Sequence, residues 1–160
     1  MRRLNRESGT LTALKWAVGR TIVRLGCGSL AESLSLTVNL EDNRSPVPVS
    51  NGASAENIMR MDLPRPELIQ AYLNSDLFVF ASNVEYSPLV LYEAAAAGLP
   101  FLSVPVGNAE EIAQWTGGGV ICPAPHDDKG YTRVDPAVLA EHISRLARDP
   151  DKLRALGETG

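Results

Sequence analysis

Residues 77–106 read LFVFASNVEYSPLVLYEAAAAGLPFLSVPV, and this stretch decides the fold. It begins at 77–82 with a nearly continuous apolar run, which is typical of a strand buried on both faces of a parallel sheet. A second run of this kind follows at 100–106. Between them, Ser87 as N-cap and Pro88 as first residue predict a helix that ends at the next glycine. The stretch is therefore predicted to form a β-α-β unit.

The same alternation continues on both sides of this unit. Residues 57–63 are a candidate strand, and the sequence Pro64-Arg65-Pro66 is suited to the start of a helix. The apolar face of that helix is expected to comprise Leu68, Ile69, Tyr72 and Leu73. Toward the C-terminus, the predicted elements are a helix at 109–115 capped by Asn108, a strand at 119–124, a helix from Asp135-Pro136 to Arg148, and a last helix from 151. Such an order predicts an α/β fold, a Rossmann-like parallel sheet with helices on both faces.

The first third of the chain carries weaker signals. Residues 11–24 are predicted to form a helix, whereas LSLTVNL at 34–40 alternates as a half-buried strand does. Residues 41–56 are rich in Pro, Ser, Asn and Gly, which is the composition of a loop.

Composition narrows the function classes. The chain has 160 residues, of which 44% are hydrophobic and 21% charged, the balance of one soluble globular domain. A formal net charge of −4 argues against a nucleic-acid partner. Two distant cysteines, Cys27 and Cys122, predict neither a disulfide framework nor a zinc site, so a cytoplasmic location is expected. The sequence His126-Asp127-Asp128 lacks the spacing of metal ligands on a helix or strand, so no metal site is predicted.

Two carboxylates mark the loop and helix that follow the strand at 77–82. Glu85 is expected in the loop and Glu93 in the second turn of the helix, so both border the space in front of the helix N-terminus. Free backbone N–H groups and the positive end of the helix dipole make that space suitable for phosphate. Carboxylates are poor phosphate ligands but good acceptors for sugar hydroxyls. The pattern therefore predicts a nucleotide sugar as the ligand.

The ordered set of motifs resembles a known family. The pattern S-x-x-E-x7-E-A-x-A-x-G-x-P, which runs from Ser82 to Pro100, is similar to the C-terminal domain of retaining GT-B glycosyltransferases, the "glycosyl transferases group 1" proteins. The resemblance covers about residues 57–160. It continues with Val106-Gly107-Asn108-Ala109-Glu110-Glu111-Ile112 and with Gly119-Val120-Ile121-Cys122-Pro123.

The resemblance implies roles for individual residues. Glu85 would act at the reaction centre by hydrogen bonding to the donor sugar, and Glu93 would accept hydrogen bonds from the ribose hydroxyls. Arg65 would lie near the nucleobase. The other implied donor contacts are Tyr86, Ser87, Pro88, Leu89, Gly107 and Asn108. The reaction would transfer a sugar from a nucleoside diphosphate to an acceptor hydroxyl with retention, without a metal or any other cofactor.

The chain departs from the family pattern in two places. The family's diphosphate-gripping loop has the pattern G-R-x4-K, and Gly19-Arg20 with Arg24 is a candidate that is one residue short. The separate acceptor-binding domain is not found either. We expect residues 1–160 to be a single nucleotide-sugar-binding domain, with 57–160 well matched and 1–56 poorly matched. The chain is then a fragment of a polysaccharide-synthesis enzyme, inactive alone, whose full-length form associates with a membrane surface.

Three alternatives remain open. One is another nucleotide-sugar enzyme of the GT-B class, such as an epimerase or a phosphorylase. Another is a non-catalytic Rossmann-like interaction module, which predicts no nucleotide-sugar binding and tolerance of Glu93→Ala. In the third, the basic segment 1–24 docks on anionic lipid.

Overall fold

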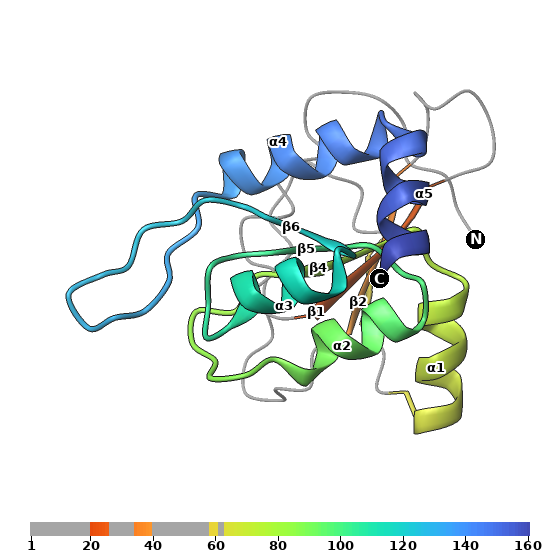
Figure 1. Ribbon diagram of the computed structural model, residues 1–160, viewed down its shortest axis with the longest axis horizontal. Coiled ribbons are helices and arrows are strands. Elements are labelled where there is room, and N and C mark those ends of the chain that lie inside the picture. Colours follow the sequence, from red (N-terminus) through yellow and green to blue (C-terminus); the bar gives the residue numbers. More distant parts are fainter. Residues whose placement is uncertain (1–19, 26–33, 40–57, 61–62) are drawn as a thin grey trace.

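A computed structural model describes residues 20–25, 34–39, 58–60 and 63–160 (Figure 1). The strands are β1 (Arg20–Leu25), β2 (Leu34–Asn39), β3 (Ile58–Arg60), β4 (Leu77–Phe80), β5 (Phe101–Ser103) and β6 (Gly119–Ile121). The helices are α1 (Arg65–Leu73), α2 (Leu89–Ala96), α3 (Ala109–Thr116), α4 (Pro136–Ala147) and α5 (Pro150–Thr159). None of the helices in these ranges has the length and apolar character that a membrane span requires.

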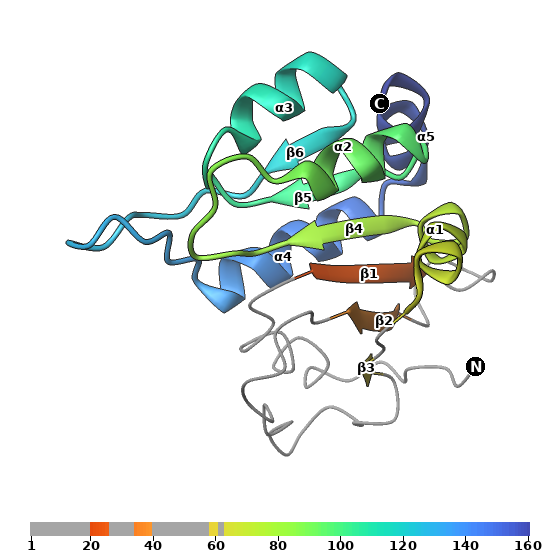
Figure 2. The ribbon, with the colours of Figure 1, turned by 90° about the horizontal axis from the view of Figure 1, so that it is seen from below.

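The strands form one sheet in the order β3-β2-β1-β4-β5-β6 (Figure 2). Strands β4, β5 and β6 are parallel, with Phe78 opposite Phe101 and Phe101 opposite Gly119. This part confirms the predicted parallel sheet of an α/β fold. Strand β1 is antiparallel to both of its neighbours, so the six-stranded sheet as a whole is mixed.

The predicted helix at 11–24 is wrong at its C-terminal end, because residues 20–25 form β1. Thr21, Ile22 and Val23 are β-branched, which lowers helix propensity and favours a strand. The strand is also hydrogen bonded on both sides, to β2 and to β4, and this pairing overrides the local pattern. Residues 11–19 and the predicted loop at 41–56 lie outside the described residues.

Helices cover both faces of the parallel half of the sheet, as predicted. Figure 1 shows α4 on one side of the strands and α2 and α3 on the other. The core lies between these layers, and β4 is buried along its whole length. The largest fully buried side chains of this core are Phe78, Phe101, Leu77, Leu91, Leu99, Leu102, Ile112, Leu139, Ile143, Val79 and Val104.

Helix α1 forms as predicted, but its apolar face is narrower. Leu68 and Tyr72 are buried, whereas Ile69 is 43% exposed and Leu73 is 55% exposed. The buried pair has the i, i+4 spacing of a single stripe along a helix. Helix α1 therefore packs through one stripe, and the prediction is wrong for Ile69 and Leu73.

The helix after β4 begins one residue later than predicted. Pro88 is the N-cap of α2, with an extended ψ of 90°, and no side chain caps the helix. Ser87 lies outside the cap position, so its prediction as N-cap is wrong. Gly98 follows the helix with a φ of 66°, the left-handed conformation that ends many helices. Asp135, by contrast, caps α4 as predicted, with its side chain accepting from Ala137 N.

Candidate functional site

Two connections meet at the carboxyl edge of β4 and β5, where ligands bind in sheets of this kind. One is the site loop, residues 81–88, and the other contains Gly107 and Asn108. Asn108 N donates to Tyr86 O at 3.1 Å. Gly107 has a φ of 54°, and a Cβ atom there would lie 2.8 Å from Glu85 O. Only glycine therefore allows the two connections to approach so closely.

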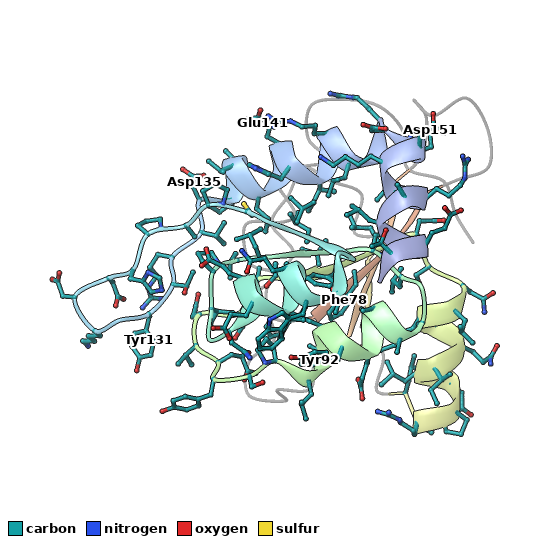
Figure 3. The ribbon with its side chains drawn as sticks, viewed as in Figure 1. Phe78, Tyr92, Tyr131, Asp135, Glu141 and Asp151 are labelled. Atoms are coloured by element: carbon teal, nitrogen blue, oxygen red, sulfur yellow. The ribbon has the colours of Figure 1, made fainter. Side chains whose placement is uncertain are left out.

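A third connection leaves the same edge. We call residues 122–135, between β6 and α4, the arm. Figure 1 shows the arm projecting from the body of the molecule, and Figure 3 shows Tyr131 on the arm and Asp135 where the arm enters α4. His126 and Thr132 form an antiparallel bridge across it.

The N-terminus of α2 faces this edge without a capping side chain. The first N–H groups of any helix lack partners within the helix, and α2 has no acidic residue in its first turn. Helix α3 starts nearby but carries Glu110 and Glu111 in its first turn. Because these carboxylates repel an anion, α2 is the helix start that suits phosphate.

Glu93 and Arg65 are brought together across two helices. Arg65 Nη1 donates to Glu93 Oε1 at 2.6 Å, joining the start of α1 to the second turn of α2. The Glu93 side chain is 29% exposed and that of Arg65 65% exposed. The hydrogen bond to Glu93, followed by its charge, raises the pKa of Arg65. The pair holds the carboxylate in one orientation, and among the described residues no second hydrogen bond to it is formed, which leaves Oε2 for a ligand.

The remaining predicted residues of the site loop differ in exposure. Glu85 is half-buried, and its side chain forms no hydrogen bond or ion pair within the described part of the chain. Tyr86 is 92% exposed, and Leu89 and Ser87 are also exposed. Pro88, which lies between Ser87 and Leu89 in the chain, is buried.

Asn108 carries an unsatisfied polar atom. It is the N-cap of α3, as predicted, but its side chain makes no capping hydrogen bond. Its Oδ1 atom is buried and accepts no hydrogen bond within the described residues. Leaving such an atom unpaired costs about 1–3 kcal/mol, so a donor supplied at this point would be stabilising.

Arg20 and Arg24, the candidate residues for binding the diphosphate, lie at opposite edges of the sheet. In the strand register, Arg20 lies opposite Phe80, at the carboxyl end of β4. Arg24 lies beyond Val23, which is opposite Leu77 at the other end of β4. The two residues therefore belong to one strand and to opposite edges, and only Arg20 is at the edge of the site.

Asp127 and Cys122, which lie outside the candidate site, are explained by their local surroundings. Asp127 accepts hydrogen bonds from Lys129 N, Tyr131 N and Arg133 within the arm. Within the described ranges, no group of three or more His, Cys, Asp or Glu side chains is arranged to hold a metal ion. Burial raises the pKa of the Cys122 thiol, which disfavours the reactive thiolate.

The sequence analysis missed Thr132. This residue is 1% exposed, and its backbone N–H donates to Asn83 O in the site loop. No motif marks Thr132, and the signal that could have directed attention to it is the unusual length of the connection at 122–135.

Comparisons with known proteins identify the family of this chain. Residues 52–160 match the family described as "Glycosyl transferases group 1". The chain is 36% identical over 93 residues to a D-inositol 3-phosphate glycosyltransferase 1 of Catenulispora acidiphila. It is 33% identical over 93 residues to a D-inositol 3-phosphate glycosyltransferase of Thermobispora bispora.

Both of these alignments span 58% of this chain and 20% of the relative. The matched region thus corresponds to about a fifth of each of these two proteins. The family match is longer, since it includes β3 and every described element after it. The chain belongs to the glycosyl transferases group 1 family.

Proposed function

We propose that this chain is the donor-binding part of a retaining glycosyltransferase, which transfers a sugar from a nucleoside diphosphate to an acceptor hydroxyl. The observation that carries the proposal is the uncapped start of α2 at the carboxyl edge of the sheet, bordered by Glu85 in the site loop and Glu93 in the helix. Such a surface combines an anion site with hydrogen-bond acceptors for hydroxyl groups.

The diphosphate lies against the start of α2. Its negative charge is stabilised by the first N–H groups of the helix and by the helix dipole. When the bond between the sugar and the diphosphate breaks, charge develops on the leaving oxygen, and the same groups stabilise it. The proposal therefore requires no metal ion or cofactor.

The nucleoside lies along Glu93 and Arg65. The free Oε2 of Glu93 accepts from the ribose hydroxyls, while the ion pair with Arg65 keeps the carboxylate oriented. Arg65 is exposed at the start of α1, so its planar guanidinium is available to a nucleobase.

The sugar lies against the site loop. Glu85 accepts from sugar hydroxyls near the reacting carbon, and Tyr86, Ser87 and Leu89 are exposed around it. The acceptor hydroxyl oxygen bonds to the anomeric carbon as the carbon–diphosphate bond breaks, and the hydroxyl proton passes to the diphosphate. Gly107 packs against the backbone of this loop, and Asn108 N donates to Tyr86 O within it.

The family and its named relatives support a proposal about the biological setting. We propose a role in surface polysaccharide or glycan assembly, in the cytoplasm or at a membrane surface, together with an acceptor-binding domain. The two relatives are named for inositol 3-phosphate, so a phosphorylated polyol is an acceptor class to test beside polysaccharide precursors.

The test is a calorimetric titration of the chain with UDP, GDP and ADP and with their sugars. We expect one diphosphate to bind saturably, Glu93→Ala to weaken it about tenfold, and Glu85→Ala to remove the extra affinity that the sugar supplies. Glu141→Ala is the matched control, because Glu141 is an exposed, ion-paired carboxylate on α4.

Two results would contradict the proposal. A folded chain that binds none of the nucleotides, even when joined to the acceptor-binding domain, would exclude a donor site here. Saturable binding that tolerates Glu93→Ala would mean that the nucleotide does not use this edge of the sheet.

A further inference from the structure

We propose that the arm positions the site loop, and that Thr132 is the positioning residue through which it acts. The role of that loop in sugar recognition rests on the proposed function. The positioning itself is argued from contacts between the arm, the site loop and the connection that follows β5.

The length of the arm is the first observation. Connections from a strand to the next helix in α/β folds usually have about two to six residues, and the arm spans 122–135. Ordering each additional residue costs conformational entropy. A long connection that is nevertheless ordered needs interactions that hold it.

The arm supplies many of these interactions itself. Asp127 Oδ1 accepts from Lys129 N and Tyr131 N, both at 2.9 Å, and Arg133 Nε donates to Asp127 Oδ2 at 2.8 Å. Arg133 N also donates to Pro125 O, which joins the two sides of the arm. The arm therefore keeps its own shape and can act as one unit.

Thr132 joins this unit to the site. Its N–H donates to Asn83 O at 2.9 Å, and its hydroxyl donates to Pro105 O at 3.2 Å. Thr132 and Ser103 are the buried polar residues within the part of the chain whose side chains are described. A buried residue with both donors used is an anchor for the two carbonyls that it binds.

Within the site loop, two carbonyls held from outside the loop flank Glu85. Asn83 O is held by Thr132 from the arm, and Tyr86 O is held by Asn108 N from the connection after β5. The short segment between these two points contains Glu85. Its placement therefore depends on Thr132, whereas Glu93 is held by α2 and by Arg65.

This difference predicts a selective effect. Loosening Thr132 should disturb the part of the ligand that Glu85 contacts and leave the part held by α2 and Glu93 intact. In terms of affinity, nucleotide-sugar binding should weaken while binding of the nucleoside diphosphate alone is retained.

Thr132→Val keeps the side-chain shape and the N–H that binds Asn83 O, but it removes the hydroxyl that fixes residue 132 on Pro105 O, so the N–H is held in place less firmly. Thr132→Ser is the control that keeps the hydroxyl. Hydrogen exchange is measured without ligand at the two amides that hold the site loop, those of residues 108 and 132, which donate to Tyr86 O and Asn83 O. Calorimetry compares the diphosphate with its sugar. We expect Thr132→Val to raise exchange at these two amides several-fold and to lower the sugar-dependent gain in affinity about fivefold. Thr132→Ser should remain close to the unmodified chain in both measurements.

A second variant avoids the buried position. Asp127→Ala removes the acceptor that holds the exposed arm together, and it is not expected to disturb the core. It should also raise exchange at the amides of residues 108 and 132, because the arm then holds Thr132 less firmly. This keeps the test decisive if Thr132→Val folds poorly.

Two results would overturn the inference. In one, exchange at the amides of residues 108 and 132 is the same in Thr132→Val and Thr132→Ser. In the other, diphosphate and nucleotide sugar lose affinity equally alongside a lower melting temperature, which is what a merely structural role produces. If exchange responds while the unmodified chain binds no nucleotide, the positioning stands and the proposed function fails.

Discussion

At the scale of single residues, Gly107 determines how closely two connections can approach. Its φ of 54° is strained for any residue with a Cβ atom, and that atom would meet the carbonyl groups of Glu85 and Tyr86. The contact lies directly behind the proposed sugar-binding loop. Gly107 thus combines a backbone requirement with a packing requirement.

Gly107→Ala is expected to be strongly destabilising. The left-handed backbone costs about 1–2 kcal/mol, and the overlap adds roughly 1–3 kcal/mol. The free energy of unfolding, measured by urea denaturation, should fall by the sum of the two costs. The site loop must also shift, so nucleotide-sugar affinity should fall with it.

Gly130→Ala provides the matched control. Gly130 has a φ of 79°, but a Cβ atom there would have no neighbour within 4 Å. This variant should pay only the backbone cost. Equal losses for Gly107→Ala and Gly130→Ala would refute the close packing at Gly107.

At the scale of elements, the helix starts differ in what satisfies their N–H groups. Asp135 Oδ1 accepts from Ala137 N at 2.7 Å at the start of α4, whereas α2 starts without a side-chain cap. The side chain of Asp135 therefore stabilises the start of α4. At α2, the uncapped groups remain available to a ligand.

This contrast predicts opposite outcomes for two substitutions. Asp135→Ala should lower the free energy of unfolding by about 1 kcal/mol, because a capping hydrogen bond is lost. Ser87→Ala should leave stability nearly unchanged, because Ser87 caps nothing. Thermal unfolding of the two variants checks this, and a larger loss for Ser87→Ala would contradict the assigned start of α2.

The arm should depend on pH through Asp127. Backbone hydrogen bonding from Tyr131 lowers the pKa of Asp127 below its ordinary value, with further lowering by Arg133 and Lys129 against partial desolvation. A group whose folded pKa is lowered stabilises above its unfolded pKa and loses that contribution as pH falls through the folded pKa. The arm should therefore be ordered at neutral pH and loosen in acid.

Nuclear magnetic resonance can measure this directly. The amide signals of Lys129 and Tyr131 should shift as the pH falls below the usual range of an aspartate, because both donate to Asp127 Oδ1. Asp127→Asn is the control and should abolish that transition. Amide signals that titrate equally in both proteins would show that another group is responsible.

At the scale of the whole molecule, the parallel half of the sheet is held between two helical layers. Ile143 on α4 is fully buried against it, whereas Ile69 on α1 is 43% exposed. The same residue type thus occurs in a central and in a peripheral position.

Ile143→Ala should cost about 2–5 kcal/mol of unfolding free energy, since it removes buried methyl groups and leaves a cavity. Ile69→Ala should change stability by less than about 1 kcal/mol, because most of that side chain is already in water. Urea denaturation distinguishes the two. Similar losses would mean that α1 packs more deeply than the structure has it.

Much of the fold was predictable because its signals are local. The β4-α2-β5 unit follows from two apolar runs and the turn residues between them, and Gly98 and Asp135 end or start helices through their own backbone or side chain. The predictions failed where a neighbouring element decides. Residues 20–25 pair with β2 and β4, and Ile69 and Leu73 lie outside the stripe by which α1 packs. The start of α2 is a local error of one residue, since Pro88 and not Ser87 is the N-cap.

The candidate site shows the same division. Glu85 and Glu93 were predicted from their spacing around a helix start, and their roles remain proposals. The hydrogen bond between Arg65 and Glu93 joins residues 28 positions apart, and that between Thr132 and Pro105 joins residues 27 apart. Such contacts leave no periodicity in the sequence, so no pattern predicts them.

The alternating elements from β3 onward, the family resemblance and the two carboxylates beside a helix start could all be predicted from the sequence. Each of these depends on residues that are close together in the chain. Two features could not be predicted from the sequence and became visible in the folded chain. Residues 20–25 form an antiparallel strand, and the arm contacts the site loop through Thr132. The physical reason is that strand pairing and buried hydrogen bonds need partners from distant segments, which folding alone brings together.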